Sequence, residues 1–167
     1  MKVIRLADLG ILPGMDIAGR MHQLFLENPM DTEYLFAPGT YRLSAGDAAG
    51  FSVSLSNSDQ LPVLKAGLLL QGMQNIRLTG NGAVLLCHGE LSALALVDSS
   101  HIAVDGLAID YDPTHNGEGV IVQAAPAYVD VAVDAKRYPY RLEGEKLFFF
   151  NGEEYTPYFG AMEFDAA

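Results

Sequence analysis

The stretch that decides the fold is "LQGMQNIRLTG" at residues 70–80, because the chain repeats its pattern as "LVDSSHIAVDG" at residues 96–106. When Ile76 is laid on Ile102, apolar and glycine positions on either side match at the same offset. A repeat of this length built from strands cannot bury its apolar side alone and must stack on copies of itself. The repeat therefore predicts parallel strands stacked as successive rungs, as in a parallel β-helix.

A second match follows after the offset contracts by two positions. Residues 82–88, "GAVLLCH", then fall on residues 106–112, "GLAIDYD". Because side chains alternate across a strand, one set is expected to point into the stack and the other to solvent. The inward set is Ile102, Val104, Leu107, Ile109 and Tyr111, and the outward set is Ala108, Asp110 and Asp112.

The flanking segments have other patterns. Residues 16–27, "DIAGRMHQLFLE", predict an amphipathic helix with Asp16 as its N-cap. Short strand-like runs fill the chain up to residue 112, which excludes a helical bundle. After about Val120 the sequence contains strand-like runs with an alternating pattern. Glu143-Gly144-Glu145 and Asn151-Gly152 are the hairpin turn candidates between them.

These patterns predict an all-β chain. We expect β-helix coils with an N-terminal capping helix in residues 1–119, and a small antiparallel β-sheet or barrel inserted at residues 120–162. Residues 163–167 would begin the return to the β-helix.

Composition excludes some partners. The formal net charge of −11 repels a phosphate backbone, so nucleic acid is not an expected partner. Cys87, the only cysteine, lies in an apolar run and is interpreted as a buried, inert thiol. No segment reaches membrane-spanning length and no signal peptide is visible, so we expect no membrane partner. The compartment stays open.

The N-terminal segments resemble the opening of the pectin-lyase-like superfamily of right-handed parallel β-helices. In that superfamily an "FGA…DG…D" entry, a capping helix and an "FPPGTY" strand follow one another. Here the matching residues, in the same order, are Asp8-Leu9-Gly10, Pro13-Gly14, Asp16 and "FAPGTY" at residues 36–41. The resemblance implies the fold and says little about chemistry.

Later segments resemble the β-helical exo-α-galactosidases of glycoside hydrolase family 110. The matching stretches are "IRLTGNGAVLLCHGE", "SSHIAVDGLAIDYDPTHNGEGVI", "YPYRLEGEKLFFFNGEEY" and "MEFD". The resemblance implies hydrolysis of terminal α-1,3-linked galactose with inversion, a galactose-containing glycan as partner, no cofactor, and an extracellular or periplasmic location. Members of that family are several times longer. They carry a small barrel inserted in the β-helix, and their main catalytic carboxylates lie beyond this barrel. We therefore expect these 167 residues to be inactive alone.

Asp110 and Asp112 are the candidate catalytic residues. Two positions apart on a strand, they share a face, which predicts carboxyl groups about 6.5 to 7 Å apart. Inverting glycosidases hold their acid and base about 6.5 to 9.5 Å apart. The alternative is that "DYDP" only ends a strand, with Asp112 forming a turn before Pro113.

Three further residues are candidate substrate ligands. The repeat places His88 one rung from Asp112, where it can bind a sugar hydroxyl or form a structural bridge between rungs. His115 and Glu118 belong to the following loop, and can contact a ligand or stay solvated. No short metal-ligand motif appears, so no metal site is expected.

Two other functions stay open. The chain can be a non-catalytic carbohydrate-binding or structural module, or part of a polysaccharide lyase, although a lyase acting on acidic pectin would be expected to have a basic groove. The last rung would expose unpaired backbone groups, so a homodimer through this edge is a further hypothesis.

Overall fold

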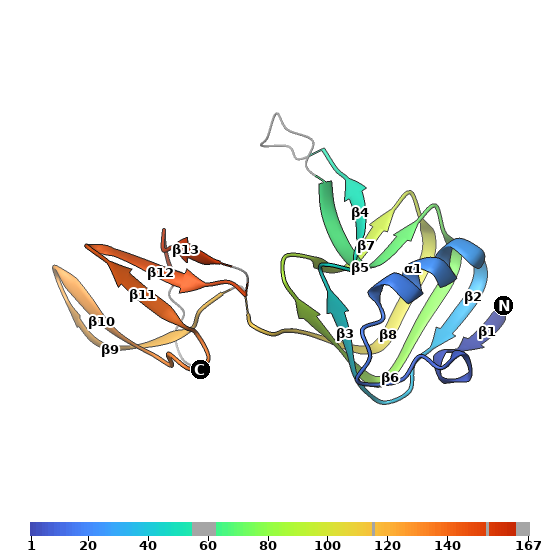
Figure 1. Ribbon diagram of the computed structural model, residues 1–167, viewed down its shortest axis with the longest axis horizontal. Helices are drawn as coiled ribbons and strands as arrows, with labels where there is room; N and C mark the ends of the chain where they lie inside the picture. The colour runs from blue at the N-terminus through green and yellow to red at the C-terminus, as the bar shows by residue number, and fades with distance from the viewer. Residues whose placement is uncertain (55–62, 115, 153, 163–167) are drawn as a thin grey trace. The chain divides into compact units, whose positions relative to one another are not determined.

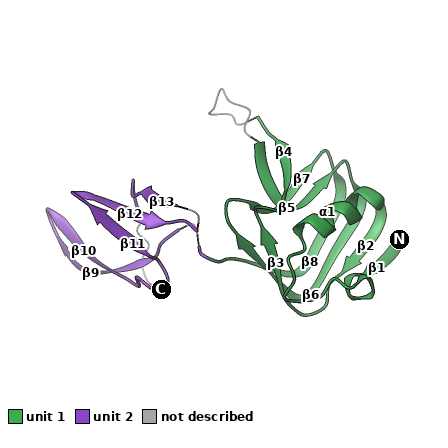
Figure 2. Ribbon diagram, viewed as in Figure 1, with its two compact units in different colours: residues 1–112 green, residues 113–167 purple. Residues whose placement is uncertain are grey.

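The computed structural model describes residues 1–54, 63–114, 116–152 and 154–162. They form strands, one α-helix, α1 (Ala18–Glu27), and a short 3-10 helix, η1 (Leu6–Leu9), so the expected all-β class is confirmed. The chain divides into two compact units, Met1–Asp112 and Pro113–Ala167 (Figure 2). Each unit is described by itself below.

The larger sheet of the first unit is parallel throughout (Figure 1). Its strands are β1 (Lys2–Arg5), β2 (Met30–Leu35), β3 (Gly39–Ser44), β6 (Gln74–His88) and β8 (Ser100–Tyr111). Along one edge β6 pairs with β2 and then with β3, and along the other edge it pairs with β8. Strand β1 pairs with β2.

A second sheet completes each rung. It contains β4 (Ala49–Ser52), β5 (Val63–Gln71) and β7 (Ser92–Val97), with β5 antiparallel to β4 and parallel to β7. The chain runs from β5 to β6 and from β7 to β8, so each passage through the two sheets adds one rung. Among the described residues neither sheet closes on itself.

The register that the repeat predicts is confirmed. Ile76 pairs with Ile102 and Thr79 with Asp105 at one common offset, and Ala83 pairs with Leu107 at an offset shorter by two positions. The contraction lies where β6 has Gly80-Asn81-Gly82 and β8 has Gly106 alone. A Cβ atom on Gly80 would collide with the backbone carbonyl of Gly106, so only glycine allows this close approach.

A second corner is made without glycine. Asp31, Asn75 and His101 stand on successive rungs with φ of 50°, 56° and 55°, the left-handed conformation that Asn, Asp and His adopt most readily. The amide Nδ2 of Asn75 donates a hydrogen bond of 2.5 Å to Oδ1 of Asp31. Side chains and backbone together therefore turn each rung at the same place.

Burial of the inward side chains changes along the stack. Tyr34 and Leu78 are both 0% exposed, whereas Val104, beside them in the next rung, is 44% exposed. Leu96 and Ile109 are similarly exposed at 52% and 50%, although their neighbours Leu70 and Leu85 are buried. The rung formed by β7 and β8 therefore presents its apolar side to solvent.

The N-terminal segment covers core residues of the same unit. Helix α1 begins at Ala18 with Ile17 as N-cap, so Asp16 is not the cap; its carboxylate instead accepts a hydrogen bond of 3.2 Å from the backbone N–H of Ala18. The backbone of Asp16 is held against Arg42 in a parallel bridge, which fixes the start of the helix one position later. The apolar face of α1 buries Ala18, Met21 and Phe25.

The second unit contains antiparallel strands. Strand β9 (Gly119–Ala125) pairs with β10 (Tyr128–Val133), and β12 (Lys146–Phe150) pairs with β11 (Tyr140–Glu143) and β13 (Tyr155–Pro157). Both expected hairpin turns are confirmed, since Glu143 pairs with Lys146 and Phe150 with Tyr155. Glycines with positive φ, Gly144 and Gly152, make these turns.

Candidate functional site

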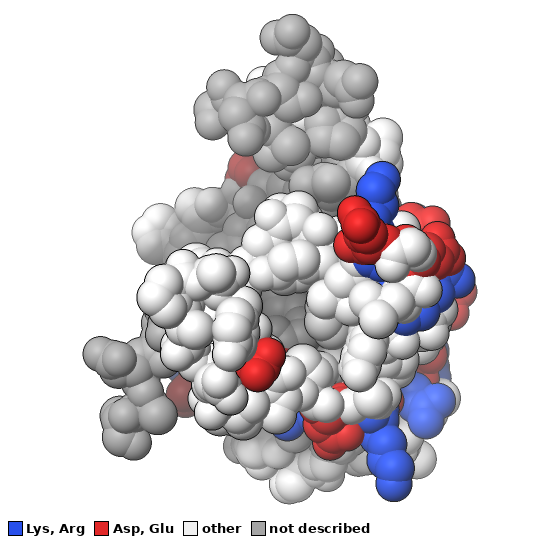
Figure 3. Space-filling view, turned by 90° about the vertical axis from the view of Figure 1, so that its left-hand side faces the viewer, with Lys and Arg blue, Asp and Glu red and all other residues white. Residues whose placement is uncertain are grey.

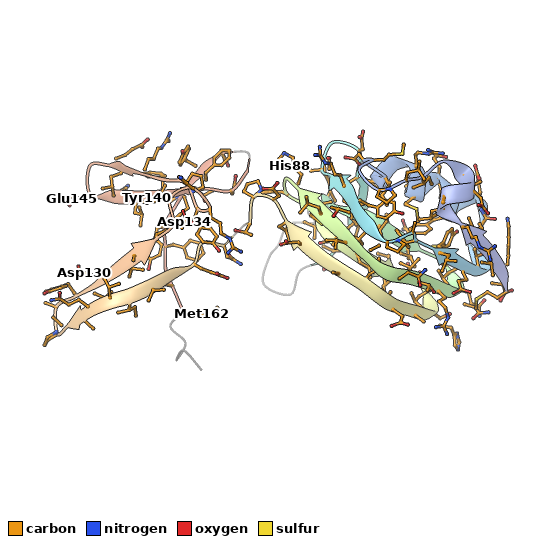
Figure 4. All side chains as sticks on the ribbon, turned by 90° about the horizontal axis from the view of Figure 1, so that it is seen from below. His88, Asp130, Asp134, Tyr140, Glu145 and Met162 are labelled. Carbon is orange, nitrogen blue, oxygen red and sulfur yellow. The ribbon has the colours of Figure 1, made fainter. Side chains whose placement is uncertain are left out.

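Polar residues gather where β3, β6 and β8 end. Ser44 is the register partner of His88, and the backbone N–H of Asp112 donates to the carbonyl oxygen of Cys87 at 2.9 Å, which extends the ladder past β8. His88 stands at the end of β6 (Figure 4). The structure therefore brings Ser44, His88 and Asp112 onto adjacent rungs.

His88 is tied to Asp112 through the backbone. Its Nδ1 atom lies 2.7 Å from the carbonyl oxygen of Asp112, which is a main-chain atom and not part of the carboxylate. The side chain of His88 is otherwise exposed. His88 thus bridges two rungs, as one of the two interpretations of the sequence requires, and still presents part of its ring to solvent.

The two candidate catalytic carboxylates are both exposed. Asp110 pairs in register with Leu86, and its Oδ1 atom accepts a hydrogen bond of 2.8 Å from the backbone N–H of Tyr111. Asp112 follows the last residue of β8 and ends the first unit. Both side chains therefore meet solvent at the end of β8.

Neither of the remaining two candidates belongs to the first unit. Glu118 belongs to the second unit, where its Oε2 atom accepts a hydrogen bond of 3.1 Å from the hydroxyl of Tyr138. His115 lies outside the described residues. The pairing of Tyr138 with Glu118 was not predicted, because two residues this far apart along the chain carry no sequence pattern that would pair them.

Cys87 has the environment of an inert thiol. It is 0% exposed, and burial raises its pKa to about 11, while a hydrogen bond with Tyr111 lowers the pKa and the charge of Asp110 raises it. Tyr111 is also its register partner on β8. A thiol with a raised pKa is a poor nucleophile at neutral pH, so Cys87 contributes packing to the site and not chemistry.

Charge on the surface is mixed. The face drawn in Figure 3 carries Lys and Arg side chains as well as Asp and Glu side chains. Among the described residues, no three His, Cys, Asp or Glu side chains gather as a metal site would require. In the same part of the chain, no helix combines the length and apolar character needed to cross a bilayer.

Comparison with known proteins gives related sequences. No family model matches the chain. It is 29% identical over 111 residues to α-1,3-galactosidase B of Akkermansia muciniphila, covering 66% of the chain and 14% of that protein. It is 22% identical over 171 residues to α-1,3-galactosidase B of Bacteroides thetaiotaomicron, covering 98% of the chain and 27% of that protein. A 73-residue match to α-1,3-galactosidase B of Parabacteroides distasonis is 33% identical and covers 44% of the chain and 12% of that protein.

These similarities support a relationship to the α-1,3-galactosidases of glycoside hydrolase family 110 and suggest a glycoside-hydrolase-like function. The chain spans 14% and 27% of the length of the first two relatives. The identities are low, so the relatives do not assign individual residues of this chain.

Proposed function

We propose that this chain is the N-terminal part of a carbohydrate-active glycoside hydrolase that releases terminal α-1,3-linked galactose with inversion. The observation that carries the proposal is the alignment of 98% of the chain with an α-1,3-galactosidase B. The parallel register of β6 with β8 supports the right-handed β-helix that the resemblance implies. Residues 120–162 are the proposed inserted antiparallel domain, and the expected return at residues 163–167 lies outside the described residues.

Asp110 and Asp112 are the proposed acid and base. One carboxyl must hold a proton for the leaving oxygen while the other, ionised, activates water. Their exposure at the end of β8 leaves both open to a ligand. His88 is a proposed ligand for a sugar hydroxyl, as are Glu118 and His115, which belong to the segment after β8.

The test is a chimera. In the Bacteroides thetaiotaomicron relative, the aligned segment of 171 residues is replaced by this chain, and galactose release from an α-1,3-linked galactobiose is measured. We expect turnover by the chimera and none by the chain alone. Asp110→Asn or Asp112→Asn should lower kcat by at least about 100-fold, the scale of lost acid–base catalysis.

Asp105→Asn is the matched control, because Asp105 is an exposed aspartate on the same strand, outside the proposed pair. It should leave kcat within about twofold of the parent chimera, because its carboxylate has no proposed role in proton transfer. A chimera that folds and has no activity would overturn the proposed function. Equal losses in all three variants would contradict the catalytic roles of Asp110 and Asp112, and would leave the proposed function of the chain standing.

A second candidate, a non-catalytic sugar-binding module, is favoured by the hydrogen bonds that already occupy Asp110 and Glu118. It predicts that both Asp variants of an active chimera lose affinity for the sugar and keep kcat. Saturation kinetics separate the two candidates, since loss of uniform binding raises KM alone.

A further inference from the structure

The hydrogen bond between His88 and Asp112 fixes where the imidazole carries its hydrogen. Nδ1 lies 2.7 Å from a backbone carbonyl oxygen, which has lone pairs and no hydrogen to give. Nδ1 must therefore be the donor. In the neutral ring only one nitrogen carries a hydrogen, so Nε2 is left as an acceptor.

The backbone holds this arrangement from both sides. Ser44 pairs with His88 on the preceding rung, and the N–H of Asp112 is bound to the carbonyl of Cys87 at 2.9 Å. The carbonyl that receives Nδ1–H thus belongs to a residue whose N–H continues the ladder past β8. A partner fixed in this way sets the tautomer and limits rotation of the ring, as it does for metal-bound and catalytic histidines.

The acidic side chains at the same strand ends are acceptors as well. Asp110 and Asp112 lie at the same strand ends, and a carboxyl group offers acceptor oxygens whether or not it carries a proton. Among the described residues, two basic side chains lie near these strand ends. Leu86 stands between Arg42 and Asp110 in the register, and Nζ of Lys65 donates a hydrogen bond of 2.8 Å to the carbonyl oxygen of Ala45. The exposed Asp110 and Asp112 therefore favour a neutral ligand with hydroxyl donors over an acidic sugar.

We propose that His88 is a substrate-positioning residue whose Nε2 atom accepts a hydrogen bond from a hydroxyl of a neutral sugar, with Nδ1–H anchored on the carbonyl of Asp112. This inference rests on the proposed function, and adds to it the tautomer, the accepting atom and the exclusion of uronic acids. It needs no proton transfer and no cofactor.

The test is nuclear magnetic resonance on the 15N-labelled chain at about pH 8, where an ordinary histidine is neutral. The spectrum has four histidines to assign, and His88→Asn identifies the signals of His88. We expect the Nδ1–H tautomer in the free protein. Methyl α-galactopyranoside should then shift the Nε2 signal of His88, and methyl α-galacturonide should not.

Two variants separate binding from folding. In His88→Asn the amide nitrogen can replace the donor Nδ1 while nothing replaces Nε2, so the fold is expected to persist and galactoside affinity to fall about tenfold, the equivalent of one hydrogen bond. His101→Asn is the control. His101 has φ of 55°, a conformation that Asn adopts readily, so this variant should bind as the parent chain does.

The outcomes are distinguishable. An Nε2–H tautomer, or galactoside-dependent shifts elsewhere in the chain without a response of His88, would overturn this inference and leave the proposed function intact. Equal binding of the galacturonide would also overturn it. If no signal in the chain responds to the galactoside, this inference fails, and the proposed function is decided separately by the activity of the chimera.

Discussion

Val104 lies beside Leu78 in the parallel register of β8 and β6, yet it is 44% exposed while Leu78 is fully buried. Each side chain is inward on its own rung. The difference arises because β6 is covered by β2 and β8 along its two edges, whereas β8 pairs along one edge only among the residues that the structure describes.

The same substitution at these two positions should therefore have unequal effects. Leu78→Ala removes packing from a closed core and is expected to lower the free energy of unfolding by about 2 to 5 kcal/mol. Val104→Ala removes contacts that are already partly lost, and should cost less than about 1 kcal/mol. Urea unfolding followed by circular dichroism measures both. Similar costs would mean that Val104 is covered in solution.

We propose that the free edge of β8 allows self-association. Leu96, Val104 and Ile109 would gain burial, while the carboxylates of Asp105 and Asp110 on the same strand would repel those of a second copy. The mass measured by sedimentation should therefore rise with concentration, and more steeply at high salt. Val104→Lys should keep the chain monomeric. A monomer mass at every concentration and salt level would contradict the proposal.

Cys87 should react slowly with thiol reagents in the folded chain. Burial raises its pKa from an ordinary 9.0 to about 11, so the thiolate is disfavoured in the native state. At about pH 8, labelling with a disulfide reagent should be slow in buffer and fast in urea. Fast labelling of the native chain would mean that the end of β6 opens readily.

The same raised pKa links stability to alkaline pH. Unfolded chains lose the thiol proton first, so the contribution of Cys87 is fully present below pH 9.0 and disappears as the pH rises to about 11. The free energy of unfolding, measured at several pH values across this range, should fall less steeply with pH for Cys87→Ala than for the parent chain. An unchanged slope would contradict the assignment, because the buried tyrosines remain in both chains.

Tyr138 should stabilise the second unit through Glu118. Tyr138 is 6% exposed and its hydroxyl donates to Oε2 of Glu118 at 3.1 Å. Tyr138→Phe keeps the ring and removes the bond, so amide hydrogen exchange in β9 to β13 is expected to accelerate while exchange in β6 is unchanged. Tyr128→Phe, on the same unit, removes an exposed hydroxyl that bonds to Gln123 and is the control. Equal effects would show that the bond to Glu118 has no special weight.

Much of the first unit could be predicted because its repeat is encoded locally. The match of Ile76 with Ile102 predicts the parallel pairing, and the glycines between Thr79 and Ala83 indicate the change in offset. Each sequence match corresponds to a direct neighbour in the ladder, so periodicity alone gives the register.

Other features depend on contacts that no local pattern records. The antiparallel pairing of β4 with β5 has no counterpart in the sequence repeat, and the start of α1 depends on the bridge between Asp16 and Arg42. At the candidate site the sequence predicted that His88 and Asp112 are neighbours, but not that the backbone of Asp112 makes the bond. Pairing can be inferred from periodicity, whereas the choice of donor and acceptor atoms depends on side-chain rotamers.

The close approach of Gly80 to Gly106 has a consequence for how this architecture can vary. The number of residues in a rung changes by two at this corner, while the strands before and after it keep their alignment. Length differences between related chains should therefore accumulate at residues 80–82 and not inside the strands, and loops of different reach can be mounted there without disturbing the polar side chains at the far end of the same strands.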